Sequence, residues 1–383
     1  MPAELWNDAG RMLGCGLTVA AVVAPVGLIS WWAARRATQP IVPHLRPWRV
    51  KWTGLEVIFA FLVLNVVVPM LVFNALAQSD FFPTIYGAEL PTSATFPVAS
   101  LESSAAIGGA ASAIVVRDHL MEWAVIRGLW AGLLSLPFQI GLLILVGQFL
   151  GRPRQGPTSW AVLPARMSLA ILAWAALTPL VLAIHALVNI VFTELQWQSE
   201  DHPLSKLSAA RPTLDHILFF LQAGIAAPII EEVLFRGVLL GWLVGGRSLV
   251  DMSRIGLGRH TLSDRGVWSV FILAVVFAIL QPRHQGQVVA DFTSGPVLFA
   301  AGLAIGWILL RSVLRKRRTI GAVYASAALF AVVHSAVWPS PIPLFALGLG
   351  LGWLAVRTRG VVAPIIVHGL FNTISVLFVL RSG

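Results

Sequence analysis

Two adjacent glutamates, Glu231 and Glu232, lie in the otherwise apolar stretch APIIEEVLFRG at residues 227–237. On a helix, Glu232 and Arg236 are four residues apart, so they share a face and can form an ion pair. Successive helix residues are rotated by about 100°, so Glu231 points away from that pair. One carboxylate is then neutralised by the arginine, and the other is free to act as a general base.

Two histidine motifs follow in later apolar stretches. His334 lies in LFAVVHSAVW, and His368 and Asn372 lie four residues apart in IIVHGLFNT. The imidazole and the amide of the second motif share one helix face, and both can donate hydrogen bonds to a developing oxyanion. Either histidine could instead be a metal ligand.

The composition indicates that these residues lie in a membrane. The chain of 383 residues is 57% hydrophobic and 11% charged, and its mean hydropathy is +0.82. A soluble domain carries roughly a quarter charged residues. The single cysteine, Cys15, leaves neither a disulfide framework nor a cysteine metal site.

Membrane-spanning helices need about 20 mostly apolar residues, and the chain contains ten candidate segments. They cover residues 12–34, 53–78, 128–150, 167–193, 216–245, 267–281, 296–311, 320–338, 342–356 and 360–380. Some of them are short or joined by tight links, so we expect an all-α, polytopic transmembrane bundle of about 8–10 spans.

The basic residues predict the orientation of this bundle. With the N-terminus outside, residues 35–51, 152–166, 247–265, 311–318 and 357–359 form the inner loops, and each carries arginine. This satisfies the positive-inside rule. The net charge of +10 is therefore a topology signal, and we expect a multi-pass protein of the cell membrane, with the lipid bilayer around it and no nucleic-acid partner. The long segment 79–120 is an outer loop in this arrangement.

Ionisable residues within a span cost about 2.5–3.5 kcal/mol each on insertion scales and are functional candidates by default. The alternative for the glutamates is a structural ion pair with a spare carboxylate. His185 and Asn189 repeat the His-x-x-x-Asn spacing of His368 and Asn372. No carboxylate pair lies near them in the sequence, and we interpret them as an interhelical hydrogen-bonding pair. No aspartate lies within a predicted span, which disfavours an aspartyl protease.

The stretches around residues 277–311 and 330–357 are similar to each other, as two copies of one helical hairpin would be. FAILQ is followed by GLAIGWILLR, and FAVVH by GLGLGWLAVR, so His334 stands where the first copy has Gln281. Shared membrane composition explains the similarity about as well as duplication does. We expect the second copy to supply the site histidine, the alternative being that the first copy occupies that place and recruits His284.

The three polar motifs, each in its own predicted membrane helix, resemble those of the CAAX protease and bacteriocin-processing family of intramembrane endopeptidases. This family includes the type II CAAX prenyl endopeptidases. The matching residues are Glu231, Glu232, Arg236, Phe330, His334, His368 and Asn372. The resemblance covers roughly residues 165–383. It divides the chain into N-terminal membrane helices of unassigned role, residues 1–160, and a protease core, residues 161–383.

The resemblance implies hydrolysis of a peptide bond in a membrane protein or a lipidated peptide. Glu231 would be the general base that activates water, aided by His334, while His368 and Asn372 would form the oxyanion hole. Glu232 and Arg236 would hold Glu231 and its helix in place.

A catalytic zinc ion bound by Glu231, His334 and His368 stays open as a cofactor. The sequence contains no H-E-x-x-H motif, which narrowly favours a metal-free mechanism.

Two other functions stay open. A secondary transporter would use the same glutamates and histidines as a proton or ion relay. A catalytically inactive immunity or scaffold protein would keep the fold without the chemistry.

Overall fold

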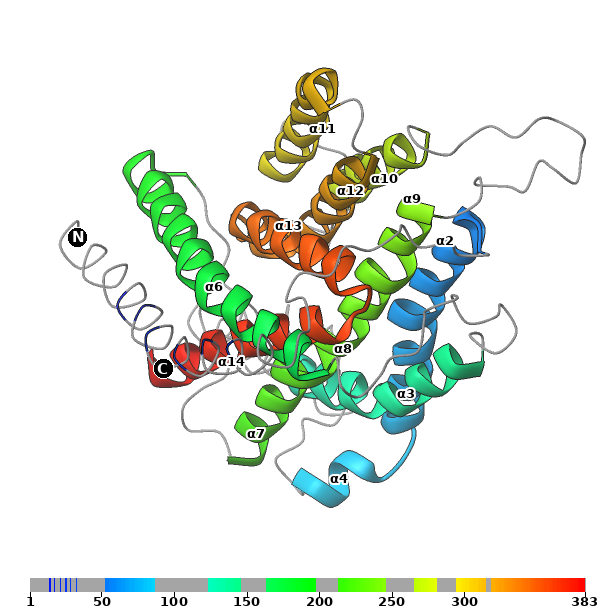
Figure 1. Cartoon of the computed structure of the whole chain (residues 1–383). Helices are drawn as coiled ribbons and strands as arrows, with labels where there is room; N and C mark the ends of the chain where they lie inside the picture. Colours follow the sequence, from blue (N-terminus) through cyan, green and yellow to red (C-terminus); the bar gives the residue numbers. More distant parts are fainter. Residues whose placement is uncertain are drawn as a thin grey trace, which may run out of the picture.

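The computed structural model describes residues 52–86, 123–145, 163–197, 213–245, 265–280, 294–314 and 318–382, and isolated positions between 14 and 32. Within these residues every regular element is helical and none is a strand. The predicted all-α helical bundle is therefore confirmed (Figure 1).

The described helices overlap nine of the ten predicted spans, although α12 (Arg318–Val332) ends before the predicted end at 338. Five are long and apolar enough to cross a membrane: Gly54–Ala77, Trp123–Leu145, Met167–Glu194, Thr213–Val244 and Pro341–Thr358. Shorter apolar helices cover Gly266–Leu280, Gly295–Arg311, Thr319–Val332 and Val362–Leu377. The predicted span at 12–34 and the loop at 79–120 lie largely outside the described residues, and the orientation stays a prediction.

The first described helices form one side of the molecule. α2 (Gly54–Leu62), the π-helix η1 (Val63–Val67) and α3 (Val68–Ala77) follow one another without a break, and the short α4 (Phe81–Tyr86) comes next. Large apolar side chains of α2 and α3, such as Phe59 and Leu71, are exposed, as a lipid-facing surface requires.

A buried polar cluster joins α4 to the span that carries the glutamates. The Tyr86 hydroxyl donates a hydrogen bond to Asp215 Oδ1 (2.6 Å), and Trp130 Nε1 donates to the Tyr86 oxygen (2.9 Å). Asp215 is completely buried in the first turn of the candidate span Thr213–Val244. The expectation that no aspartate lies within a span is therefore wrong at this end of the helix.

The glutamates lie on an interrupted helix. It runs through α7 (Thr213–Leu221), the π-helix η5 (Gln222–Ala226), α8 (Ala227–Glu232), the π-helix η6 (Val233–Leu239) and α9 (Leu240–Gly245). In Figure 1 these pieces, from α7 to α9, cross the molecule as one green rod. π-helical turns are rare and occur frequently at functional sites.

Two hairpins and a final helix complete the bundle. They are α10 (Arg265–Leu280) with α11 (Gly295–Leu314), then α12 (Arg318–Val332) with α13 (Pro341–Thr358), and last α14 (Val362–Ser382). The short 3₁₀-helix η8 (Ser335–Val337) joins α12 to α13. α13 and α14 both pack against α6 (Leu163–Glu194). The two hairpins are the segments whose sequences are similar.

Small residues bring α12 and α13 close together. A Cβ atom on Gly348 would lie 3.1 Å from the Cβ of Ala327 and 3.3 Å from a ring carbon of Phe330. One apolar core joins η6, α10 and α12 around Leu234, Phe271 and Phe330, and a second joins α6, α13 and α14. Phe330, one of the motif residues, belongs to the first of these cores.

Candidate active site

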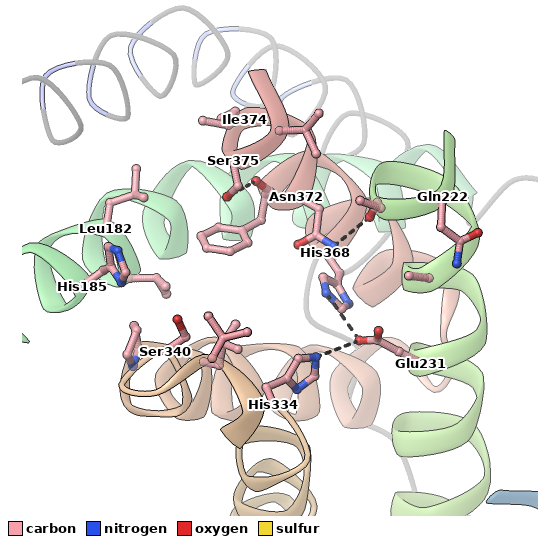
Figure 2. A pocket seen from close by; sticks show the side chains of 18 of the residues that line it. Leu182, His185, Gln222, Glu231, His334, Ser340, His368, Asn372, Ile374 and Ser375 are labelled. Carbon is pink, nitrogen blue, oxygen red and sulfur yellow. Dashed lines mark hydrogen bonds and ion pairs between the residues drawn. The ribbon is translucent and has the colours of Figure 1, made fainter. Parts of the chain in front are cut away.

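The three predicted motifs converge on one cavity of about 500 Å³. Glu231 comes from α8, His334 follows the end of α12, and His368 and Asn372 come from α14; all four line the cavity (Figure 2). Residues up to 141 positions apart, from 231 to 372, thus meet because three helices pack around one space.

Glu231 lies between the two histidines. Its Oε2 atom is 3.8 Å from Nε2 of His334 and 3.8 Å from Nε2 of His368. The Glu231 side chain is 24% exposed and that of His334 is 32% exposed, so both can be reached from the cavity. Among the described residues, none donates a hydrogen bond to the buried Oε2 atom.

Glu232 is more deeply buried than Glu231, and its Oε2 atom likewise has no hydrogen-bond partner among the described residues. Its side chain is fully buried, and Oε1 accepts hydrogen bonds from Arg236 Nη1 at 2.8 Å and from His368 Nδ1 at 2.9 Å. The contact with Arg236 agrees with the i, i+4 spacing. The contact with His368 was missed from the sequence, because no pattern within one helix indicates which distant side chain a carboxylate meets.

Arg236 is enclosed as completely as its partner. Its Nη2 atom donates to the Gly348 carbonyl at 3.4 Å, and its guanidinium lies 4.3 Å from the centre of the Phe330 ring. Phe330 also packs against both site histidines, with ring centres 4.9 Å from His334 and 5.6 Å from His368. Buried charges are tolerated when they are paired and hydrogen-bonded in this way.

The hydrogen bonds also determine which tautomer each neutral imidazole adopts. His334 Nδ1 lies 2.7 Å from the carbonyl oxygen of Phe330, and His368 Nδ1 faces the carboxylate of Glu232. Both partners accept hydrogen bonds, so each Nδ1 carries the ring proton. In the neutral state, each Nε2 then presents a lone pair toward Glu231.

Asn372 is held by a backbone irregularity in η5. Ala227 N donates to the Gln222 carbonyl, five residues back, so the next such bond would run from residue 228 to the carbonyl of Ala223. Pro228 has no N–H to donate, and Asn372 Nδ2 donates to the Ala223 oxygen instead, at 2.8 Å. The amide keeps a second N–H for the cavity that it lines.

A glycine allows α14 to approach η5 closely enough for this bond. A Cβ atom on Gly369 would lie 2.9 Å from the Gly224 carbonyl oxygen. Gly369 follows His368 directly and precedes Asn372 by three residues. The close approach of α14 to η5 therefore brings both side chains to the cavity.

The other polar residues singled out from the sequence do not all lie where they were expected. Gln281 and His284 lie outside the described residues. Asn189 Nδ2 contacts His185 Nε2 at 3.1 Å within α6, so the pair is not interhelical as predicted. His185 lines the same cavity as Glu231, which the sequence analysis missed because α6 carries no carboxylate beside it.

The predicted metal ligands do not fit a zinc ion as they are placed. Tetrahedral bonds of about 2.0–2.1 Å would bring ligand atoms to about 3.4 Å from one another, whereas Glu231 Oε2 lies 3.8 Å from each Nε2 atom. Among the described residues, no group of histidine, cysteine and carboxylate side chains has the geometry of a metal site. The metalloprotease prediction is therefore not supported.

The fold and the site together define a class: a polytopic helical membrane protein with carboxylates and histidines around a cavity inside its bundle. Residues 213–314 and 308–374 match the family model described as "Type II CAAX prenyl endopeptidase Rce1-like". The chain therefore carries a type II CAAX prenyl endopeptidase Rce1-like domain across residues 213–374, and the resemblance inferred from the three motifs is confirmed. This match supports an intramembrane CAAX endopeptidase at the level of the family.

The matched region contains all seven motif residues, from Glu231 to Asn372, and excludes α6 and everything before it. No curated protein and no solved structure matches the chain.

Proposed function

We propose that this protein hydrolyses a peptide bond of a membrane-associated protein or lipidated peptide inside the cavity, with Glu231 as the general base. The observation that carries the proposal is the Glu231 Oε2 atom, buried without a hydrogen-bond donor among the described residues and 3.8 Å from two imidazole nitrogens. This separation is too long for a direct hydrogen bond, and a water molecule that enters from the cavity would supply the missing donor.

The protonation states favour water in that position. Glu231 Oε2 and the Nε2 atom of neutral His334 are both hydrogen-bond acceptors, so they need a donor between them. A water molecule donating to Glu231 and to His334 would direct its oxygen lone pairs at a substrate carbonyl. As the oxygen attacks the carbonyl carbon, Glu231 takes the water proton.

Collapse of the tetrahedral intermediate completes the hydrolysis. The C–N bond breaks, and the proton held by Glu231 passes to the leaving nitrogen. The products are a carboxylic acid and an amine, and the carboxylate of Glu231 is regenerated.

His368 and Asn372 are the proposed oxyanion hole. Because the Nδ1–H of His368 already donates to Glu232, His368 can donate to an oxyanion from Nε2 only as the imidazolium ion. Asn372 would add its second N–H, and preorganised donors of this kind account for a large part of acyl-transfer catalysis.

Glu232 and Arg236 act as positioning residues in this proposal. From the sequence, they were expected to hold Glu231 and its helix in place. The hydrogen bond from His368 Nδ1 to Glu232 supports a different role, which is to fix the ring orientation of His368.

The test compares newly created protein termini in cells that contain wild-type protein, the Glu231→Gln variant or the Glu194→Gln variant at matched expression. Glu194 is an exposed glutamate at the end of α6 and serves as the control. Loss of a general base lowers the rate by about 10²–10⁴-fold. We therefore expect a set of cleavages that is present with wild type and Glu194→Gln and lost with Glu231→Gln.

Identical termini in all three samples would contradict the proposal. They would favour an inactive immunity or scaffold protein, or a transporter. In a transporter, neutralising Glu231 would abolish transport without changing the cleavage of any peptide bond.

A further inference from the structure

The cavity has a second polar side, formed by α6. His185 lines the same cavity as Glu231, and Figure 2 shows it with Leu182 across the open space from Glu231, His334 and His368. Val181 and Leu182, one turn earlier on α6, also line the cavity, so the imidazole lies on the inward face of this helix. α6 lies outside the region that matches the family model.

One ring nitrogen of His185 takes part in a hydrogen bond. Asn189 Nδ2 donates to Nε2 at 3.1 Å, so Nε2 is an acceptor and Nδ1 carries the ring proton. Among the described residues, none other than Asn189 hydrogen-bonds to this ring. The pair thus holds the imidazole at a fixed orientation and leaves one N–H donor.

A peptide in this cavity needs such donors. Away from the motif residues, the walls are mostly apolar, with Leu182, Phe219, Leu344 and Phe371 among the lining side chains. Peptide carbonyls that lose water without gaining a hydrogen bond are costly to bury. A donor opposite the scissile bond would therefore select and orient the bound chain.

We propose that His185 is a substrate-positioning residue, whose Nδ1–H donates a hydrogen bond to a backbone carbonyl of the bound peptide on the α6 side of the cavity. Asn189 keeps the ring in the orientation that this bond requires. The inference rests on the proposed endopeptidase function and adds to it a contact outside the family-matched domain.

The test uses the full-length protein in membranes and a peptide whose sequence is taken from the cleavages that depend on Glu231. The variants are His185→Leu, which removes the donor, and His185→Gln, which keeps an N–H donor. The control is His216→Leu. His216 is the one histidine among the described residues that does not line the cavity.

We expect His185→Leu to raise KM about three- to tenfold, the effect of one neutral hydrogen bond, with little change in kcat. His185→Gln should recover part of the loss, and His216→Leu should behave as wild type. Equal KM values for the Leu and Gln variants, or a loss confined to kcat, would overturn the inference.

If His185→Leu does not accumulate, His185→Ala replaces it. Failure of both apolar variants to accumulate, while His185→Gln does, would assign His185 a role in folding and also overturn the inference. Failure of the proposed function has a separate signature, because no cleavage would then depend on Glu231.

Discussion

Two neighbouring carboxylates have different chemical environments because a helix turns by about 100° between them. Glu232 points into the packed interior and accepts from Arg236 and His368. Glu231 lines the cavity, and its side chain is 24% exposed. The division into a supporting and a reactive carboxylate, expected from the sequence, thus has a structural counterpart, but the supporting one contacts His368 rather than Glu231.

At this scale we predict that Glu232→Gln is strongly destabilising. The substitution leaves the guanidinium of Arg236 fully buried without its ion-pair partner, at a cost of about 3–5 kcal/mol in the free energy of unfolding. Replacing Arg236 as well, by Met, should recover much of that stability. Denaturant unfolding in detergent micelles would measure both.

The same double variant separates stability from positioning. We expect it to remain nearly inactive in the termini assay even where its stability recovers, because His368 has lost the carboxylate that orients it. Near wild-type cleavage by a stable double variant would show that Glu232 acts only through stability.

At the scale of elements, the site depends on irregular helices that pack unusually closely. Pro228 leaves the Ala223 carbonyl without its π-helical partner, and Asn372 takes that place. Gly369 then allows α14 to contact η5 across a gap that no larger residue fits. A regular helix with a side chain at 369 would hold His368 and Asn372 farther from the glutamates.

We predict that Gly369→Ala impairs catalysis more than it impairs folding. The added Cβ would lie 2.9 Å from the Gly224 oxygen, so α14 must shift and carry both proposed oxyanion donors with it. Loss of one oxyanion donor typically lowers kcat by about 10²–10³-fold. The measurement is kcat on a peptide that requires Glu231, alongside thermal unfolding.

Gly302→Ala is the matched control for this prediction. A Cβ atom on Gly302 of α11 would meet nothing within 4 Å, so the change should leave activity intact. Equal activities of the two alanine variants would contradict the role given to the close approach of α14.

At the scale of the whole molecule, the cavity is lined in part by the link between α12 and α13. His334 follows the end of α12, and Ser340, which also lines the cavity, precedes the first residue of α13. In the predicted orientation, with the N-terminus outside, the link between these two helices is on the outer side. The cavity would then be reached from the outer half of the membrane.

Cysteine labelling tests this orientation. In a Cys15→Ser background, we expect Ser79→Cys and Ser340→Cys to react with a membrane-impermeant maleimide in sealed vesicles whose outer face corresponds to the cell exterior. Ser253→Cys, in a predicted inner loop, should react only after permeabilisation. The opposite pattern would reverse the topology and place the cavity entrance on the inner side.

Much of this protein is determined by local sequence. The long apolar runs predict the helices, because a chain in lipid must satisfy its own backbone hydrogen bonds. Glu232 and Arg236 are paired by spacing within one helix, a contact that needs no knowledge of the rest of the fold. The three polar motifs, in order, also indicate the family.

Tertiary structure decided which distant groups meet. His368 binds Glu232, Asn372 caps a carbonyl left open by Pro228, and His185 faces the cavity. These contacts depend on helix rotation and on approaches permitted by glycine at 348 and 369, which side-chain packing between helices sets. A helix sequence defines its own faces, whereas the partner of each face follows from the packing of the entire bundle.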